Sequence, residues 1–303
     1  MSKTTSPDVY SYVTERIIAR LEQGQVPWVN TMAKPLLMAR SATTGKIYRG
    51  INTFLLGSSP FGSAFWTTYK TAQSMGGIVK HGEKSSLCVF WKRYETKEVD
   101  EETGKRKVVP MLKYFNVFNL DQCEGVKDPL LDEVNIPDPI AKADEVIEAF
   151  TGKPAVTFGS CNRAFYVPSE DRIVMPQQTA FKNPADMYRT YFHELIHSTG
   201  HASRLNRFVG EKVDMTGYGM EELVAELGAA ILMAECGIFE DTAEKAASYC
   251  QHWITELKGD SKLIVRAAGK AQKAVDLILG RKYENNEGEA APVAAPVTEL
   301  AYA

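Results

Sequence analysis

The sequence predicts an α+β protein built from two domains. Its 303 residues exceed the usual size of one domain, so two domains of roughly 100 to 200 residues each are expected. A proline-rich stretch without a clear period separates a first half containing strand-like segments from a second half dominated by helical patterns. We therefore expect an N-terminal mixed α/β domain at 1–127, a linker at 128–140, a C-terminal domain at 141–282 and a disordered tail at 283–303.

The first half is expected to begin with a helix at 7–23. Ser6 is a candidate cap, Pro7 suits the first turn, and apolar residues recur at helical spacing until Gly24. The following stretch, 25–65, is rich in Gly, Pro, Ser and Thr, which predicts loops with short elements.

A short helix is expected at 67–75, and a β-hairpin after it. The segments 86–95 and 107–118 are rich in β-branched and aromatic residues and flank a charged stretch containing Thr103 and Gly104. The charges of that stretch predict a solvated hairpin tip.

The second half combines a few short strands with a series of helices. Asn183 followed by Pro184 is typical of a helix start. The tail from Glu284 is rich in Ala, Pro and Glu and poor in large apolar residues, which predicts disorder. The expected elements are, in order, a helix at 140–151, a strand at 155–159, two short strands around Pro168 to Asp171, and helices at 184–199, 219–236, 241–258 and 260–279.

Composition indicates a protein of a reducing compartment. The 44% apolar and 24% charged residues are ordinary for a globular protein. The five cysteines are scattered and never spaced as CxxC, which argues against a disulfide framework or a cysteine-zinc knuckle. No run approaches the ~18 apolar residues of a membrane span, and the N-terminus lacks an apolar signal region. We expect a cytoplasmic protein with no membrane partner.

The net charge of −3 conceals two halves of opposite sign. Residues 1–127 contain 18 Lys+Arg and 11 Asp+Glu, a balance of +7, whereas the remainder contains 17 and 27, a balance of −10. This asymmetry predicts a polyanionic partner for the first half only.

The chemistry-bearing motif of the second half is HELIH at 193–197. His193 and His197 stand four residues apart, so a helix places both imidazoles on one face, where they can bind one metal ion. Glu194 then lies beside them, in position to take a proton from a metal-bound water, whose pKa zinc lowers to roughly 7.

A catalytic zinc usually takes three protein ligands, and the helix expected at 219–236 offers the third. Glu222 and Glu226 are also four residues apart and share a helix face, opposite an apolar face. One carboxylate can bind the metal while the other accepts the remaining N–H of a ligand histidine.

In this arrangement the sequence resembles the zincin metallopeptidases in which a later glutamate completes the HExxH site. The resemblance implies that Glu194 is catalytic, that His193, His197 and Glu222 bind the metal, and that Glu226 supports a histidine. Glu226 stands where the thermolysin-like pattern has Asp, so the two glutamates could exchange roles.

Three further features surround this motif. His201 continues the four-residue spacing, but Gly200 ends the helix, which favours a structural histidine over a ligand. Tyr218 could donate a hydrogen bond to a developing oxyanion or simply pack. The strand pair at 165–176 resembles the edge hairpin of zincins, along which a peptide substrate can add as a further strand.

The first half carries a basic and aromatic segment. Between 31 and 93 there are nine Lys+Arg, eight aromatic residues and a single acidic residue, Glu83. Single-stranded nucleic acid is bound by such cations and aromatic faces, although the aromatics could instead fill a small core. The candidate phosphate contacts are Lys46, Arg49, Lys70, Lys80, Lys84 and Lys92, and the candidate stacking platforms are Trp66, Tyr69 and Trp91.

Four segments, 44–52, 66–92, 114–125 and 193–205, together resemble the ArdC-type antirestriction proteins of conjugative plasmids. The resemblance covers nearly all of the chain except the tail. It implies an N-terminal domain that binds single-stranded DNA, related to the N-terminal part of some plasmid TraC primases, fused to a zincin-like domain. It also implies that the protein shields incoming plasmid DNA from host restriction during conjugation.

Two alternatives remain at the sequence level. SprT-like metalloproteases also couple HExxH to DNA binding, which would add a protein substrate to the partners. In a pure binding module, the metal would only brace the fold. The motif favours zinc, while manganese or another divalent ion remains open.

Overall fold

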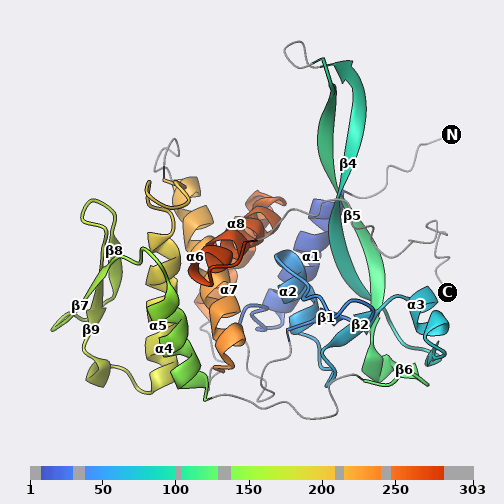
Figure 1. Ribbon diagram of the computed structural model, residues 1–303, viewed down its shortest axis with the longest axis horizontal. Helices are drawn as coiled ribbons and strands as arrows, with labels where there is room; N and C mark the ends of the chain where they lie inside the picture. The colour runs from blue at the N-terminus through green and yellow to red at the C-terminus, as the bar shows by residue number, and fades with distance from the viewer. Residues whose placement is uncertain are drawn as a thin grey trace.

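The computed structural model describes residues 8–29, 38–99, 104–128, 138–208, 215–239 and 247–282. The chain combines helices with small, mostly antiparallel sheets, which confirms the predicted α+β class (Figure 1). The expected linker core at 129–137 and the tail from 283 lie outside the described residues.

The chain begins with α1 (Val9–Glu22), whose buried side chains repeat at helical spacing. Its cap is Asp8, whose carboxylate accepts a hydrogen bond from Tyr10 N; the predicted cap Ser6 lies outside the described residues.

The stretch expected as mostly loop contains another helix, α2 (Ile51–Gly57), which is too short to show a period. The strands β1 (Arg40–Ser41) and β2 (Phe65–Thr67) flank it, and α3 (Tyr69–Ser74) follows, capped by Thr68.

The predicted hairpin is confirmed as β4 (Ser86–Val99) and β5 (Arg106–Asn119), paired antiparallel. It belongs to a sheet of order β1-β2-β5-β4 and projects from the body of the molecule (Figure 1). Beside this sheet, β3 (Ile78–Val79) pairs with β6 (Cys123–Glu124), which follows a 3-10 turn at Leu120–Gln122.

The second half places a three-stranded sheet against a group of helices. In the sheet order β7-β9-β8, β8 is an edge strand and runs antiparallel to β9. Within the described residues, no helix is long and apolar enough to cross a membrane. The elements are α4 (Pro139–Ala149), β7 (Ala155–Gly159), β8 (Phe165–Val167), β9 (Arg172–Pro176), a 3-10 turn at Gln178–Ala180, α5 (Pro184–Ser198), α6 (Met215–Cys236), α7 (Ala247–Gly259) and α8 (Leu263–Ile278).

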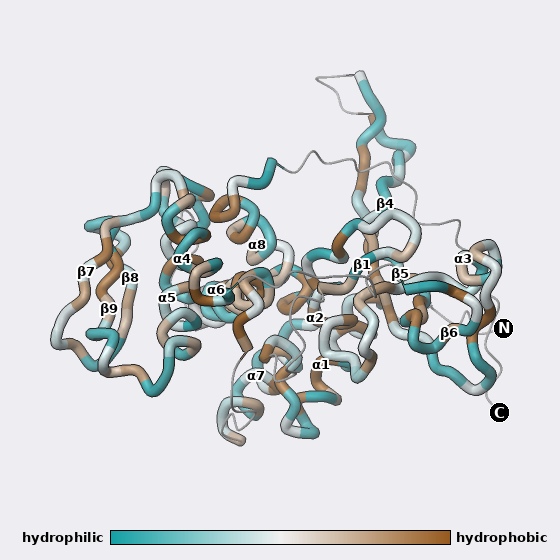
Figure 2. Tube along the Cα trace, turned by 60° about the horizontal axis from the view of Figure 1, so that its bottom comes forward, coloured by the Kyte–Doolittle hydropathy of each residue, from teal (hydrophilic) through white to brown (hydrophobic). Residues whose placement is uncertain are grey.

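One hydrophobic core joins the two halves. Ile17 of α1 is 1% exposed and belongs to the same buried cluster as α6, α7 and α8. Figure 2 shows hydrophobic stretches near α6, in the middle of the molecule, where Ile231 is fully buried. Because apolar surface from both halves is removed from water in one cluster, the helices and the hairpin support one another.

Polar contacts fix the same interface. Thr14 Oγ1 donates to Ser261 O at 2.7 Å, just before α8 begins. Trp28 Nε1 donates to Tyr249 OH of α7 at 3.0 Å. These donors depend on the second half, so α1 is held to the start of α8, and the segment after α1 is held to α7.

The shared core predicts that a cavity in α1 destabilises both halves. Ile17→Ala should lower the free energy of unfolding by about 2 to 5 kcal/mol, because the buried side chain leaves a void. Denaturant unfolding followed by tryptophan fluorescence and by circular dichroism should show one coincident, shifted transition. Ile78→Ala, at a residue 56% exposed, should change little. Separate transitions for the two signals would contradict a shared core.

Candidate metal centre

Helix α5 presents both histidines of the HELIH motif on one face. Asn183 Oδ1 accepts a hydrogen bond from Asp186 N at 2.8 Å, and Pro184 occupies the first turn, so the helix starts where the sequence predicts. His193 and His197 then lie side by side, with their Nε2 atoms 3.1 Å apart.

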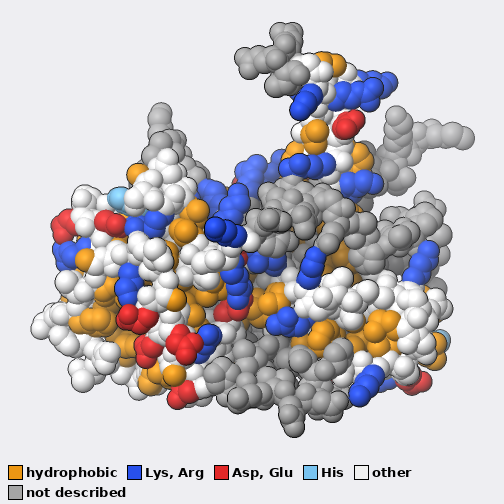
Figure 3. Space-filling view, viewed as in Figure 1, with side chains coloured by type: hydrophobic (Ala, Val, Ile, Leu, Met, Phe, Trp, Pro, Cys, Tyr) orange, Lys and Arg blue, Asp and Glu red, His pale blue; other side chains and the backbone are white. Residues whose placement is uncertain are grey.

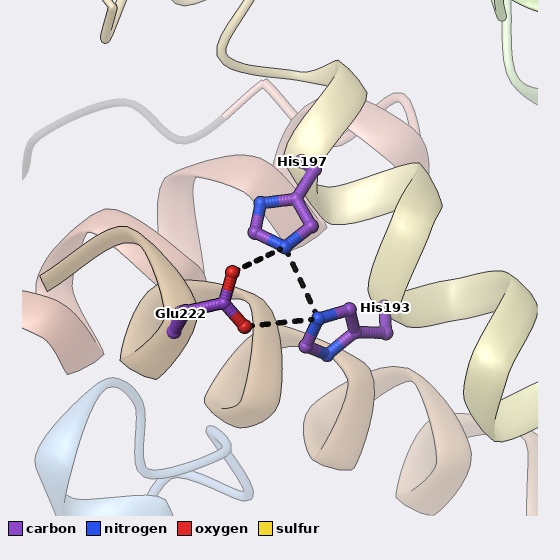
Figure 4. A group of neighbouring side chains, drawn as sticks. All are labelled: His193, His197 and Glu222. Atoms are coloured by element: carbon purple, nitrogen blue, oxygen red, sulfur yellow. Dashed lines mark hydrogen bonds and ion pairs between the residues drawn. The ribbon is translucent and has the colours of Figure 1, made fainter. Parts of the chain in front are cut away.

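Helix α6 brings Glu222 opposite this pair. Its carboxylate oxygens lie 3.5 Å from His193 Nε2 and 3.5 Å from His197 Nε2 (Figure 4). All three side chains point toward one another from two neighbouring helices. The structure thus brings together the three residues expected to bind metal.

Close packing of α5 on α6 depends on Gly228. A Cβ placed on this residue would lie 2.6 Å from Ile196 Cδ1 and 2.8 Å from Ile196 Cγ1. Ile196 is fully buried and precedes His197, so any added bulk pushes directly on the histidine helix. The missing side chain lets Glu222 approach the histidines.

The donor set fits a divalent metal ion. Bonds of about 2.0 to 2.1 Å in a tetrahedral zinc site place neighbouring ligand atoms roughly 3.3 Å apart. The spacings here, 3.1, 3.5 and 3.5 Å, match that value. Two imidazoles and one carboxylate leave a fourth position for water or substrate, which is typical of catalytic rather than structural zinc.

Buried charge surrounds the histidines. Burial lowers the pKa of His193, but the carboxylates of Glu222, Glu226 and Glu194 raise it by more, so the net pKa lies above the usual value. A metal ion bound there would take the place of that proton and satisfy the same carboxylates.

Glu194 lies in the position expected of a general base. It is only 8% exposed, and burial raises its pKa, opposed mainly by the two histidines. The backbone N–H of Tyr166 also donates to this carboxylate, so Glu194 lies beside the edge strand β8. The reacting side chain and the sheet edge that could hold a peptide are therefore adjacent.

Glu221 contacts the ring nitrogen of His197 that does not face Glu222. Its Oε1 lies 3.4 Å from His197 Nδ1, and Arg207 Nη2 donates to the same oxygen at 2.7 Å. Burial raises the pKa of Glu221, but hydrogen bonds from His197 and Arg207 outweigh it, and the net pKa is lowered. A carboxylate in this place fixes the tautomer and orientation of a metal-binding imidazole.

Glu226, expected to support a histidine, is instead in an ion pair with Arg189 of α5. The structure therefore corrects that role: Glu221, and not Glu226, faces His197 Nδ1. Sequence reasoning missed Glu221 because it sought two carboxylates on one helix face. The side chains of consecutive helix residues instead point about 100° apart, so Glu221 and Glu222 reach the His197 imidazole from two sides.

Of the two other candidates, only His201 can be placed, and it is outside the cluster. His201 Nδ1 is 2.8 Å from Ser203 Oγ, in the turn after α5, as expected of a structural histidine. Tyr218 belongs to α6, but its side chain is outside what the structure describes.

The candidate DNA contacts do not all face solvent. Trp66 is only 2% exposed and packs on Phe61, so its assignment as a stacking platform is wrong. Arg49 forms an ion pair with Asp276 of α8, so part of its charge is used between the two halves. Tyr69 and Trp91 are 51% and 53% exposed and remain accessible to bases. The candidate lysines Lys46, Lys70, Lys80, Lys84 and Lys92 are all exposed.

Two protein families match the chain. Residues 7–118 match the N-terminal domain of anti-restriction factor ArdC, and residues 141–270 match a zincin-like metallopeptidase family. The two matches leave the boundary region between them unassigned.

Several known proteins resemble the chain along most of its length. Two Escherichia coli proteins named DNA primase TraC are 34% and 32% identical over 89% of this chain, which spans 27% and 20% of their lengths. The protein y4eC of Sinorhizobium fredii is 28% identical over 94% of this chain and 96% of its own.

Two crystal structures of the antirestriction protein ArdC from plasmid R388 have a similar fold. The metal-free structure shares 36% identity with a TM-score of 0.72, covering 90% of this chain and 97% of that one. The Mn(II)-bound structure gives 36% and 0.70, covering 90% and 98%. A relative that binds a divalent metal agrees with the donor set described above.

The packing of Gly228 makes a first prediction about the metal centre. Gly228→Val should push α6 away from Ile196 and weaken metal binding, measured by titration with zinc or manganese. The matched control is Gly269→Val, also inside a helix, where an added Cβ meets nothing within 4 Å. If Gly228→Val bound metal as tightly as the control, the close approach of the helices would not be what positions Glu222.

Glu221 makes a second prediction. Glu221→Gln should lower metal affinity by about 10- to 100-fold, because His197 loses the carboxylate that orients it and Arg207 loses a buried partner. The exposed Glu145→Gln should leave affinity unchanged. Unchanged affinity in both variants would show that the Glu221–His197 contact does not support the metal ligand.

Proposed function

The chain belongs to the family of ArdC-type antirestriction proteins, and on that basis we propose that it binds single-stranded DNA and protects it from restriction. The DNA in question is plasmid DNA that enters a new host by conjugation, and the protein acts in the cytoplasm. We propose the boundary between its DNA-binding and zincin-like domains at residues 128–140.

Exposed aromatic and basic residues in the first half support DNA binding. Trp91 on β4 and Tyr69 on α3 offer accessible ring faces among several exposed lysines. Stacking of a base on such a ring contributes about 1 to 3 kcal/mol, and lysines neutralise the phosphates between bases. The charge balance of +7 in residues 1–127 favours a polyanion as the partner.

The open fourth position of the metal centre carries the proposal of hydrolytic chemistry. A structural metal usually has four protein ligands, whereas the described part of the chain supplies three, His193, His197 and Glu222. We propose zinc as the ion, with manganese as the alternative that the Mn(II)-bound relative suggests. A bound ion would supply Lewis acidity, polarising a carbonyl and acidifying water.

The proton transfer and the binding of the peptide would depend on residues of the chain itself. Glu194, buried and of raised pKa, takes the proton from the attacking water and returns it to the leaving amine. The edge strand β8 holds an extended peptide beside Glu194. This arrangement favours a peptidase that acts on DNA-associated proteins, like the SprT-like enzymes, over a protein whose metal only stabilises the fold.

DNA binding is tested by filter binding of single-stranded and duplex oligonucleotides at graded salt. We expect tighter binding of single strands, with log affinity falling linearly with log salt by about 0.7 per phosphate contacted. Affinity that is insensitive to salt, or equal for duplex, would reject the proposal.

The role of the metal centre is tested by Glu194→Gln. Because Glu194 is not a metal ligand in this geometry, the variant should keep its metal and lose peptide hydrolysis by about 100-fold or more. Restriction protection in a conjugation assay then separates the two roles. Protection that persists assigns it to DNA binding, and protection that disappears with hydrolysis assigns it to the peptidase. Metal loss in this variant would contradict the proposed ligand set.

A further inference from the structure

Basic residues line the solvent-facing side of α8 and its N-cap. Its lysines and arginine stand four, four and three residues apart, so they lie on one face along about 16 Å of helix. The opposite face of α8 is buried in the core, which fixes this face outward. No acidic residue occurs between the first and the last of these positions. The residues are Lys262, Arg266, Lys270 and Lys273, hereafter the α8 basic face.

The α8 basic face meets the aromatic residues of the first half. Lys262 Nζ lies 5.6 Å from the ring centre of Tyr10 on α1. The Tyr10 ring in turn lies 6.3 Å from the ring of Trp91 on the hairpin. Figure 3 shows Lys and Arg side chains gathered over α8 and at the base of the hairpin. Cations and an exposed indole are thereby joined into one surface across both halves.

Carboxylates lie at both ends of the α8 basic face. Asp260 lies 3.8 Å from Arg266 at the start of the helix, where both side chains are about half exposed. Asp276, after the last lysine, is engaged by Arg49. Glu95, further out on the hairpin, lies 4.0 Å from Arg106. An exposed pair such as Asp260–Arg266 contributes only about 0 to 1 kcal/mol, so Arg266 can still contact a phosphate.

We propose that a single strand of nucleic acid lies along the α8 basic face and passes onto Tyr10 and Trp91. Phosphates contact the cations of α8, and one base stacks on the Trp91 indole. This proposal rests on the proposed function, and it places part of the DNA site in the half that the charge balance marks as acidic. Because α8 packs against α6, the strand is bound by the same helical unit that holds the metal centre.

The hairpin offers one competing surface. Phe90, Lys92 and Tyr94 on β4 share a face with Lys113 on β5, and both lysines approach the Tyr94 ring, at 5.3 and 5.7 Å. Trp91 points to the other face, toward Tyr10. Neighbouring residues of β4 therefore face opposite sides of the hairpin, and each side offers a possible path for the nucleic acid.

The test compares three double variants that each remove two positive charges. Arg266→Gln/Lys273→Gln changes the α8 basic face, and Lys92→Gln/Lys113→Gln changes the opposite hairpin face. Arg163→Gln/Lys182→Gln, at exposed positions beside the three-stranded sheet, is the control for net charge. Affinity for a labelled single-stranded oligonucleotide is measured at several salt concentrations, with metal content and thermal unfolding as checks of folding.

We expect the α8 variant alone to lower the slope of log affinity against log salt, by about 1.4 for two phosphate contacts. Trp91→Ala should weaken binding by roughly 5- to 150-fold without changing the slope, and Trp91→Phe should restore most of the affinity. If the α8 variant behaves like the control while the wild-type chain binds, the proposal is overturned. A slope change only in the Lys92/Lys113 variant also overturns it. If the wild-type chain binds no single strand, the proposed function itself fails.

Discussion

The contact between Ile196 and Gly228 determines the geometry on which the metal centre depends. It sets how closely α5 and α6 approach, and these two helices supply all three candidate ligands. The core around it is fully buried, so an error in this spacing cannot relax into solvent. Catalytic metal geometry tolerates little displacement, which makes an ordinary packing contact decisive for chemistry.

Electrostatic compensation is the second constraint on this region. Glu221, Glu222 and Glu226 enter the interior from one helix, and each has a cationic or imidazole partner there. Arg189 and Arg207 neutralise the two carboxylates that do not face both histidines. Glu222 completes the donor set with the two histidines.

Much of this could be predicted from the sequence because the signals are local. The HELIH spacing defines a helix face, Asn183-Pro184 defines its start, and two segments rich in β-branched and aromatic residues define the hairpin. The partner of His197 could not be predicted, because the direction from which α6 meets α5 decides whether Glu221 or Glu226 faces this imidazole.

The burial of Trp66 and the pairing of Arg49 with Asp276 were hidden for a similar reason. Both follow from how distant segments pack, and composition gives an exposed and a buried tryptophan the same weight. The basic face of α8 was not visible in the net charge of its half, since most acidic residues of that half lie on other elements.

The most direct test is a crystal structure of the chain grown with zinc or manganese, with the ion located by anomalous scattering. We predict one ion bound by His193 Nε2, His197 Nε2 and a Glu222 carboxylate oxygen, with Glu221 on His197 Nδ1 and a remaining position open to solvent. An ion bound through Glu221 or Glu226 in place of Glu222, or a centre closed by a fourth protein ligand, would contradict this account.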